Sequence, residues 1–381
     1  MAKIIISGYY GFDNLGDEAI LMSMIEAFKS IDKNLEITVL SNSPEKTSNE
    51  YGVDSINRNN ILAFIKELKS ADLFISGGGS LLQDVTGWKS IPFYLGQVIL
   101  AKILRRKTVV FAQGIGPVQN KKYQYIIKKV LGKVDLLSVR DFRSKDLLEN
   151  WGLNEKEVKL AADPVYFLKT ISKNKSSEHR ELFSEDLKRI LSSEKPLIGV
   201  SVRPWGDNNY LSAMADSLAK LARNITANLL ITPMHFHEDQ ETSLKLKKMI
   251  IKKFNESKYQ GEIMLDLKKY TPGEMLDIYK KLDLLIGVRL HSLIFAAVNN
   301  VPFVAVEYDP KVKAFLEMIS LTSGIDIENL DSKKLLRISE SIWKNREQFK
   351  GVLEQQGSQL NKLALNNFIT VLDMIEERNN V

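Results

Sequence analysis

The sequence contains no cysteine among its 381 residues and only four histidines. The absence of cysteine excludes disulfide bonds, thiolate catalysis and cysteine-ligated zinc. Long apolar runs are also lacking, because the longest, Ile91 to Leu104, is interrupted by Gln97 and Lys102. It is shorter than the roughly 20 residues of a membrane-spanning helix. Lys3 leads directly into an apolar strand, without the hydrophobic segment of a signal peptide, so we expect a cytoplasmic protein.

Two nucleotide-binding motifs are missing as well. No G-x-x-x-x-G-K-[ST] motif occurs, which argues against a P-loop NTPase. The first glycine-rich segment, Gly8–Glu18, has the spacing G-x-x-G-x-x-x-x-G and places Asp17 where a pyrophosphate would have to approach, which argues against hydride transfer. The net charge of +6 is mild, and the scattered lysines match no nucleic-acid-binding motif, so we expect no nucleic-acid partner.

What the sequence does have is an alternation of short apolar segments and longer amphipathic segments. The 44% hydrophobic and 26% charged composition is typical of a globular protein, and the length suffices for two domains. The alternation predicts βαβ units with parallel sheets. We predict strands at Lys3–Ser7, Ile37–Leu40, Leu73–Ser76, Thr108–Gln113, Leu136–Val139, Val158–Ala161, Leu197–Val202, Asn228–Thr232, Ile263–Leu267, Leu284–Val288 and Phe303–Glu307.

These strands form two groups, separated by a polar and charged stretch. We predict an α/β protein with two doubly wound, Rossmann-like domains that face a cleft. The expected boundaries are 1–168 for the N-terminal domain, 169–195 for a linker, 196–340 for the C-terminal domain and 341–381 for C-terminal helices that could pack back on the N-terminal domain. Ligands in such sheets bind beyond the carboxyl ends of the strands.

Cationic or imidazole side chains follow four of the predicted strands. In Gly287-Val288-Arg289-Leu290-His291-Ser292, an arginine and a histidine stand at a strand end. A guanidinium binds carboxylates and phosphates in a fork, and an imidazole can move protons near neutral pH. A structural ion pair would give the same pattern for one such motif. Because the pattern recurs, we interpret it as a site for an anionic substrate; the other three positions are Arg140, Arg203 and His235 with His237.

The segment His235-x-His237, followed by Glu238 and Asp239, suggests two alternatives. If the predicted strand continued, alternate residues would face the same side and could bind a metal ion. No third or fourth ligand is evident at a matching spacing, so we expect no metal. Hydrogen bonding to a sugar or its phosphate is the interpretation we favour.

A basic stretch between residues 121 and 133 carries lysines interleaved with apolar residues, and the apolar segment Trp88–Leu104 with Arg105–Lys107 precedes it. One interpretation is a solvated helix face. The other is docking on an anionic membrane surface, where each nearby lysine or arginine contributes about 1 kcal/mol.

Several motifs in order resemble the polysaccharide pyruvyltransferase family, and in particular its CsaB-type members of bacterial cell-wall polymer assembly. They are Ser7–Ala19, Ile75–Asp84, Gln113–Pro117 and Arg289–Ser292, and the likeness extends from Met1 to about Leu330. The resemblance implies a fold similar to GT-B glycosyltransferases, with phosphoenolpyruvate as donor and no cofactor. It also implies an acceptor sugar, typically N-acetylmannosamine, in a lipid-diphosphate-linked precursor. The product would be a pyruvate ketal whose carboxylate S-layer homology domains can recognise.

The resemblance implies that Arg140 and His291 are site positions, and we add Arg289 and Arg203 from their places at strand ends. We expect His291 to protonate C3 of the enol while a sugar hydroxyl attacks C2 and phosphate leaves. Arg289 and Asp13 complete the expected catalytic set; Asp13 is ranked first as the base, ahead of Asp84 and Glu307. The expected substrate-binding residues are Arg140, Arg203, Tyr10, Phe12, Gly78, Gly79, Ser80, His235, His237 and Ser292.

Two other functions remain open from the sequence. A GT-B glycosyltransferase that uses a nucleotide sugar would share the fold, and a non-catalytic sugar-binding module would share the sugar site. Such a module has no need for a protonatable histidine beside arginine. Because the acceptor would be linked to a lipid, we expect the protein to bind peripherally to the inner face of the membrane.

Overall fold

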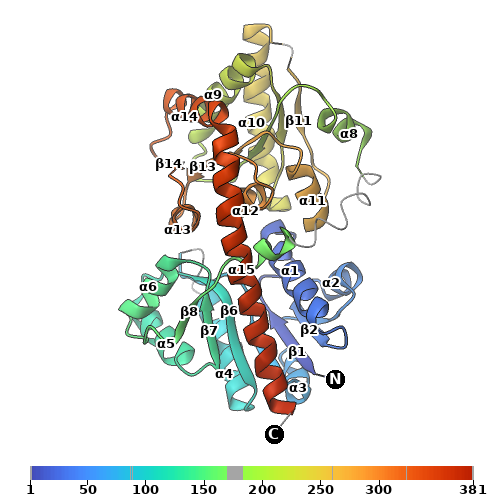
Figure 1. Ribbon diagram of the computed structural model, residues 1–381, viewed down its shortest axis with the longest axis vertical. Helices are drawn as coiled ribbons and strands as arrows, with labels where there is room; N and C mark the ends of the chain where they lie inside the picture. The colour runs from blue at the N-terminus through green and yellow to red at the C-terminus, as the bar shows by residue number, and fades with distance from the viewer. Residues whose placement is uncertain are drawn as a thin grey trace. The chain divides into compact units, whose positions relative to one another are not determined.

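The computed structural model describes residues 2–85, 87, 89–169, 183–259, 261–322 and 324–379, and the side chains of these residues up to Ile375. The chain forms two compact units. Unit 1 comprises Met1–Phe167 and Gln359–Val381, and unit 2 comprises Leu168–Ser358 (Figure 1).

Unit 1 is built on a parallel sheet with the order β3-β2-β1-β4-β6-β7-β8, and β5 pairs with β6. All six predicted strands of this half are confirmed. β3 and β5 were missed, because one is mostly polar and the other is a four-residue segment just after β4. The strands are β1 (Lys3–Ser7), β2 (Glu36–Ser41), β3 (Asp54–Asn57), β4 (Leu73–Ser76), β5 (Gly79–Leu82), β6 (Lys107–Ile115), β7 (Leu136–Val139) and β8 (Val158–Leu160).

Helices cover both faces of this sheet, because its strands alternate their side chains between two apolar layers. Neighbouring residues Val110 and Phe111 of β6 belong to different layers. The helices of unit 1 are α1 (Leu15–Ile31), α2 (Pro44–Tyr51), α3 (Ile61–Ser70), α4 (Ser90–Ile103), α5 (Lys121–Leu131), α6 (Phe142–Asn150) and the short η1 (Pro164–Phe167), with the last part of α15 (Arg346–Asn379).

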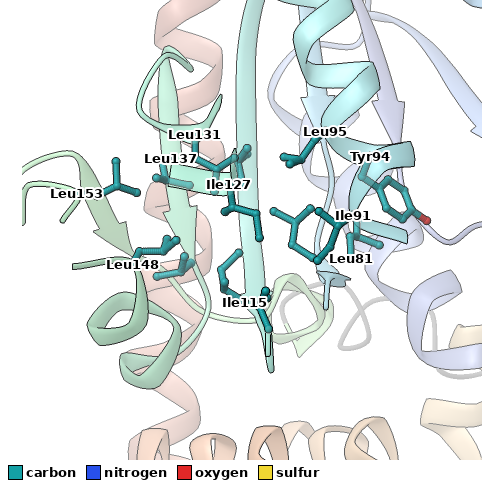
Figure 2. Packing of buried hydrophobic residues seen from close by; sticks show 14 of the residues in the cluster. Leu81, Ile91, Tyr94, Leu95, Ile115, Ile127, Leu131, Leu137, Leu148 and Leu153 are labelled. Carbon is teal, nitrogen blue, oxygen red and sulfur yellow. The ribbon is translucent and has the colours of Figure 1, made fainter. Parts of the chain in front are cut away.

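On the face of Val110, helices α4, α5 and α6 bury one apolar cluster. Its members come from α4 (Ile91, Leu95), α5 (Ile127) and α6 (Leu148), packed against β5, β6 and β7. Figure 2 shows Ile91, Leu95, Ile127 and Leu148 among the buried side chains of this cluster. Burial of this kind stabilises by about 25 cal/mol per Å² of apolar surface, so this layer fixes the strand ends beside it.

On the face of Phe111, α15 completes the core of unit 1. The ring of Phe368 lies edge-on to Phe28 of α1 with centroids 5.3 Å apart, 4.9 Å from Phe111 and 5.4 Å from Phe167. Phe368 is fully buried. Asn361 also donates to the carbonyl of Tyr166 at 2.7 Å. Residues far apart in the sequence therefore share one core.

We predict that Phe368→Ala destabilises unit 1 by about 3–5 kcal/mol, because it removes a buried ring and leaves a cavity between three other rings. Its neighbour Ile369, which is 41% exposed, provides the matched control, and Ile369→Ala should cost far less. Urea denaturation followed by circular dichroism measures both. Equal effects of the two substitutions would mean that this end of α15 does not contribute to the core.

Unit 2 contains a second parallel sheet with the order β11-β10-β9-β12-β13-β14. All five predicted strands are confirmed, and only the three-residue β14 was missed. The strands are β9 (Leu197–Ser201), β10 (Asn228–Ile231), β11 (Ile263–Leu265), β12 (Leu284–Gly287), β13 (Phe303–Glu307) and β14 (Gly324–Asp326). The helices are α8 (Glu185–Leu191), α9 (Tyr210–Ile225), α10 (Phe236–Ser257), α11 (Pro272–Tyr279), α12 (Leu290–Val298), α13 (Pro310–Met318) and α14 (Ser332–Lys344), with the first part of α15.

Of the linker expected at 169–195, residues 170–182 lie outside the described residues. The remainder contains α8, which belongs to unit 2. At the other boundary, α15 continues without a break from unit 2 into unit 1, where side chains between residues 359 and 375 contribute to the core. No helix in the described part of the chain is long and apolar enough to cross a membrane.

Candidate active site

In unit 2, three neighbouring strands direct polar side chains to one edge of the sheet. β9, β12 and β13 are adjacent and parallel, so their carboxyl ends lie together. Arg203 follows β9, Arg289 follows β12 and Tyr308 follows β13. The prediction that Arg203 and Arg289 each follow a strand is therefore confirmed, and the two strands are neighbours.

Arg289 is held by two carboxylates from the start of α10. Its Nε donates to both oxygens of Asp239 at 3.1 Å, and its Nη2 lies 2.5 Å from Asp239 Oδ1 and 2.8 Å from Glu238 Oε2. Asp239 is completely buried and also accepts from the backbone amides of Met234 and His235. Although burial opposes it, these carboxylates raise the pKa of Arg289.

The same network acts on Glu238. Although partial burial works in the opposite direction, hydrogen bonds from Arg289 and His235 lower the pKa of Glu238 to about 2. Because two of its nitrogens are bound to carboxylates, Arg289 joins the start of α10 to the start of α12. This arrangement argues against the expected role of Arg289 as a fork for a donor anion.

The interpretation of His235 and His237 as alternate residues of a strand is wrong. β10 ends at Ile231, and α10 begins at Phe236, so His235 is the residue before the helix and His237 lies in its first turn. His235 Nδ1 lies 3.0 Å from Glu238 Oε2, whereas His237 is exposed. Across the described residues, no group of three histidine or carboxylate side chains is arranged so that it could hold a metal ion.

Arg203 lies beside two aromatic rings. Its guanidinium carbon is 4.4 Å from the ring centre of Tyr308 and 6.0 Å from that of Trp205. Lys311, in the first turn of α13, places Nζ 5.2 Å from the same Tyr308 ring centre. Among the described residues, no carboxylate forms an ion pair with Arg203, whose Nε donates to the carbonyl of Pro204. The pair Arg203 and Lys311 is suited to bind an anion.

His291 and Ser292 lie in the first turn of α12. His291 is half-buried, and the helix start places the positive end of the peptide dipoles near it. Ser292 is completely buried, and its hydroxyl donates to the carbonyl of Arg289 at 2.6 Å. Ser292 was expected to bind substrate, but in the structure its hydroxyl group stabilises the start of α12.

In unit 1, the structure brings together Arg140 and Ser80, two of the predicted residues. Arg140 Nη2 donates to Ser80 Oγ at 3.0 Å, and Nη1 lies 2.9 Å from Asp163 Oδ2. The guanidinium packs on Gly114, where an added Cβ would lie 3.0 Å from Nε and Nη2. Arg140 is 6% exposed and neutralised by Asp163, so this pair is a buried anchor for the loop after β4.

The glycines of that loop are required by close packing. Gly79 has a φ of +95°, and a Cβ there would lie 2.9 Å from Asp17 Oδ1. A Cβ on Gly78 would lie 3.0 Å from Ile20. Both glycines therefore let the loop approach α1, whether or not a substrate also contacts their backbone.

The glycine-rich loop after β1 divides its aromatic residues between core and surface. Tyr10 is fully buried, and a Cβ on Gly8 or Gly77 would clash with its ring. The expected contact of Tyr10 with substrate is therefore not available in this structure. Phe12, by contrast, is half-buried and stacks on Tyr9 with ring centres 4.1 Å apart and an angle of 6°.

Arg58 supports this aromatic pair, and no sequence pattern pointed to it because β3, which precedes it, was not predicted. Its guanidinium carbon lies 5.1 Å from the ring centre of Phe12, 4.4 Å from Phe93 and 5.3 Å from Tyr94. It also donates to the carbonyl of Gly8 at 3.2 Å and to the hydroxyl of Tyr94 at 3.1 Å. Arg58 thus ties the loop to α4.

The three candidate bases are engaged in other contacts. Asp13 forms an ion pair with Lys46 at 2.5 Å. Asp84 accepts from the backbone amides of Gln119 and Asn120 at 2.9–3.0 Å. The carboxyl group of Glu307 lies against Gly324 of the neighbouring strand. None of the three is favoured as a base by its surroundings.

Glu18 is a further ionisable group of this loop. Its Oε1 accepts from the amide of Gly11 at 2.8 Å, and the hydroxyl of Tyr51 donates to Oε2 at 3.1 Å. Burial raises the pKa of Glu18 to about 7, although these hydrogen bonds and Lys46 act against the shift. The carboxyl group that holds Gly11 therefore changes its charge near neutral pH.

We predict that Glu18→Gln makes the free energy of unfolding less dependent on pH. Between the unfolded value of 4.5 and the folded value of about 7, the folded state keeps a proton that the unfolded state loses. Stability from this group is therefore present below pH 4.5 and is lost as the pH rises through 7. The variant, whose amide can still accept from Gly11, should flatten this fall and be more stable at pH 8.

Urea denaturation at intervals between pH 4 and 8 measures the effect. Glu45→Gln, which changes an exposed carboxyl group of α2, is the control and should leave the pH dependence unchanged. An unchanged slope for Glu18→Gln would contradict the prediction.

Comparisons with known proteins agree with this architecture. The putative UDP-N-acetylglucosamine 2-epimerase from Listeria monocytogenes superposes with a TM-score of 0.70 at 9% identity, covering 99% of this chain and 97% of that one. The Neisseria meningitidis UDP-GlcNAc 2-epimerase gives 0.69 at 9% identity, covering 99% of this chain and 100% of that one. Anabaena HepE in complex with UDP-glucose gives 0.61 at 12% identity, covering 100% of each. At these identities the likeness shows the fold alone, and that fold is GT-B-like.

Sequence comparisons are more informative about function. The amylovoran biosynthesis protein AmsJ of Erwinia amylovora is 20% identical over 409 residues, which cover 93% of this chain and 94% of that protein. A profile of the polysaccharide pyruvyl transferase family matches residues 14–310. That range contains Arg58, the Arg140 anchor and the unit 2 cluster of Arg203, Arg289 and His291. The chain therefore belongs to the polysaccharide pyruvyl transferase family, and it is a transferase enzyme of polysaccharide pyruvylation.

Proposed function

We propose that the protein transfers the pyruvyl group of phosphoenolpyruvate to a sugar of a lipid-diphosphate-linked cell-wall polymer precursor, such as N-acetylmannosamine, as a ketal. The observation that supports this donor most is the pair of cations at the strand ends of unit 2. Arg203 has no carboxylate partner among the described residues, and Lys311 lies beside the same ring. A small polyanion is the natural complement of such a pair.

The start of α12 supports the same location for the donor. Helix amides favour an anion, and the first turn carries His291. Once an anion lies there, a protonated imidazole in the same turn can deliver a proton to C3 of the enol. The carbon framework then carries positive charge at C2, which a sugar hydroxyl attacks. A second hydroxyl closes the ketal as phosphate leaves, and no metal or redox step is needed to balance the reaction.

We also propose that the aromatic pair Tyr9 and Phe12 of unit 1, taken by itself, is a sugar-binding surface. Both side chains are half-buried, and their rings stack with centres 4.1 Å apart. Aromatic faces suit the apolar side of a pyranose ring, while Arg58 keeps Phe12 in place. Arg140 and Ser80 support this assignment indirectly, because they fix the neighbouring loop.

We predict that the wild-type protein releases phosphate from phosphoenolpyruvate only when a lipid-linked amino-sugar acceptor is present. His291→Ala should lower turnover by about 10² to 10⁴, because a positioned acid is lost while the fold is kept. Phosphate release and mass spectrometry of the acceptor provide the measurement. Lys248→Ala, which changes an exposed side chain of α10, is the control and should keep full turnover.

A UDP-sugar forms the second arm of this experiment. Consumption of the UDP-sugar, with no phosphate release from phosphoenolpyruvate, would replace the proposal by a glycosyltransferase. Turnover of His291→Ala close to the wild-type value would remove His291 from the mechanism.

A lipid-linked acceptor would be reached at a membrane surface, and unit 1 offers a face that fits. Exposed apolar residues occur on three helices that cover one layer of the sheet: Leu62 of α3 is 77% exposed, Ile103 of α4 is 69% exposed and Tyr125 of α5 is 62% exposed. Exposed lysines on and after α5 accompany them, namely Lys121, Lys122, Lys129 and Lys133. Trp88, which was expected to contribute, lies outside the described residues.

Two of the expected basic residues have other partners. Arg106 donates to the carbonyls of Leu104 and Ala71, and Lys107 donates to the carbonyl of Met374. We therefore propose docking on an anionic bilayer through the α3–α5 face and the four exposed lysines, with Arg105 but without Arg106 and Lys107.

We predict that the protein sediments with liposomes that contain anionic lipid, and that binding falls as salt rises, because charges are screened beyond about 8 Å at physiological ionic strength. Changing Lys121, Lys122, Lys129 and Lys133 to Gln should abolish most of this binding. The equal charge change on α10, at Lys245, Lys247, Lys248 and Lys252, is the control and should have little effect. If both quadruple variants sediment like the wild type, or nothing binds, the α5 lysines are an ordinary solvated face.

A further inference from the structure

Tyr308 is buried, yet its surroundings differ from those of the other buried tyrosines. Burial alone raises the pKa of a phenol, as it does for Tyr279 of the same unit, which lies near Thr232 and Met234. At Tyr308, burial acts in the same upward direction, but Lys311, Arg203 and Arg289 outweigh it and lower the pKa. Burial likewise raises the pKa of Tyr10, Tyr94, Tyr166 and Tyr210.

The geometry explains this difference. The guanidinium carbon of Arg203 is 4.4 Å from the Tyr308 ring centre, and Lys311 Nζ is 5.2 Å from it. The indole of Trp205 packs edge-on to the ring at 5.5 Å. Tyr210 of α9 fixes the backbone of Arg203, because its hydroxyl donates to the Arg203 carbonyl at 2.5 Å. The cations are thus held beside the phenol by packing from three directions.

The carboxylates near this cluster have contacts of their own. Asp239 and Glu238 bind Arg289. Asp309 accepts from the backbone amide of Lys311 at 2.9 Å and lies 3.6 Å from its Nζ. The carboxyl group of Glu307 faces Gly324 of β14. The phenol of Tyr308 is thus a further oxygen acid beside Arg203 and Lys311, in addition to the Asp309 carboxylate.

We propose that Tyr308 is a catalytic residue that takes the proton of the attacking sugar hydroxyl and gives it to the departing phosphate. This role rests on the proposed function. It fills the place of the base, for which Asp13, Asp84 and Glu307 are poorly placed. The cations that stabilise the phenolate are also the proposed anchors of the donor phosphate, so the proton would be accepted and released within one charge cluster.

The proton balance of the cycle closes. In the first step, the tyrosinate accepts the hydroxyl proton as the oxygen–C2 bond forms, and His291 donates a proton to C3. In the second step, the C2–oxygen bond to phosphate breaks, and Tyr308 protonates the leaving phosphate oxygen. The second hydroxyl attacks C2 and returns its proton to His291. Phosphate and ketal leave, and both residues regain their initial charge.

The test compares Tyr308→Phe with Tyr279→Phe, a matched loss of a buried hydroxyl in the same unit. We expect Tyr308→Phe to keep phosphoenolpyruvate affinity within about twofold by calorimetry, because the ring and its cations remain. Its turnover should fall by about 10²-fold or more. It should also lose the rise of kcat with pH that the wild type shows as the tyrosinate forms, whereas Tyr279→Phe should retain it.

A second variant keeps the proposal testable if Tyr308→Phe folds poorly. Incorporation of 3-fluorotyrosine at position 308 preserves the hydroxyl and acidifies it, so the rising limb of the pH profile should move to lower pH. Ultraviolet titration of tyrosinate gives a readout that does not depend on turnover. The difference between the wild type and Tyr308→Phe should show a tyrosine that ionises at a lower pH than free tyrosine. Inorganic phosphate should move this ionisation to a higher pH.

The outcomes separate the two claims. An active wild type whose pH profile is unchanged in Tyr308→Phe, or whose loss of activity lies only in the KM for phosphoenolpyruvate, overturns the proton-transfer role alone. A wild type that forms no ketal from phosphoenolpyruvate overturns the proposed function, and the role of Tyr308 with it.

Discussion

The buried ion pair of Arg289 and Asp239 is the interaction on which the unit 2 site depends. An arginine at a strand end is costly to bury without a partner, and breaking such a pair costs about 3–5 kcal/mol because one charge is left uncompensated. Asp239 meets this requirement and also accepts from the two backbone amides before α10. One carboxylate therefore sets both the start of α10 and the position of the residue from which α12 begins. The half-buried His291 owes its place to this pair.

The fold was largely predictable from the sequence, because apolar strands in parallel sheets are short, continuous and separated by helical periodicity. Eleven strands were predicted where the structure has them, including the pair β9 and β12 that carries Arg203 and Arg289. The strands that escaped were β3, whose four residues include one apolar side chain, β5, which follows two residues after β4, and β14 at the sheet edge. Edge strands need little apolar character, so local pattern does not reveal them.

The site was predictable only in part. Arg140, Arg203 and Arg289 were found because each follows a predicted strand. The partners come from elsewhere in the sequence: Asp163 for Arg140 and Asp239 for Arg289. Whether a cation is neutralised by its own protein or left for a ligand depends on such distant contacts. Arg58 and Tyr308 were missed for the same reason, since their surroundings are assembled from separate strands and helices. The start of α10 at Phe236 was missed because the spacing of the histidines before and after it fits a strand as well as a helix.

The shared core of unit 1 also constrains the order in which the protein can fold during its synthesis. Domains usually fold as they leave the ribosome, N-terminal first. Here the ring of Phe368, which fills the space between Phe28 and Phe111, is translated only after all of unit 2. The first 167 residues must therefore wait with an apolar layer uncovered until the last helix arrives, so a ribosome that stalls within unit 2 would hold an incomplete, aggregation-prone sheet rather than a finished domain.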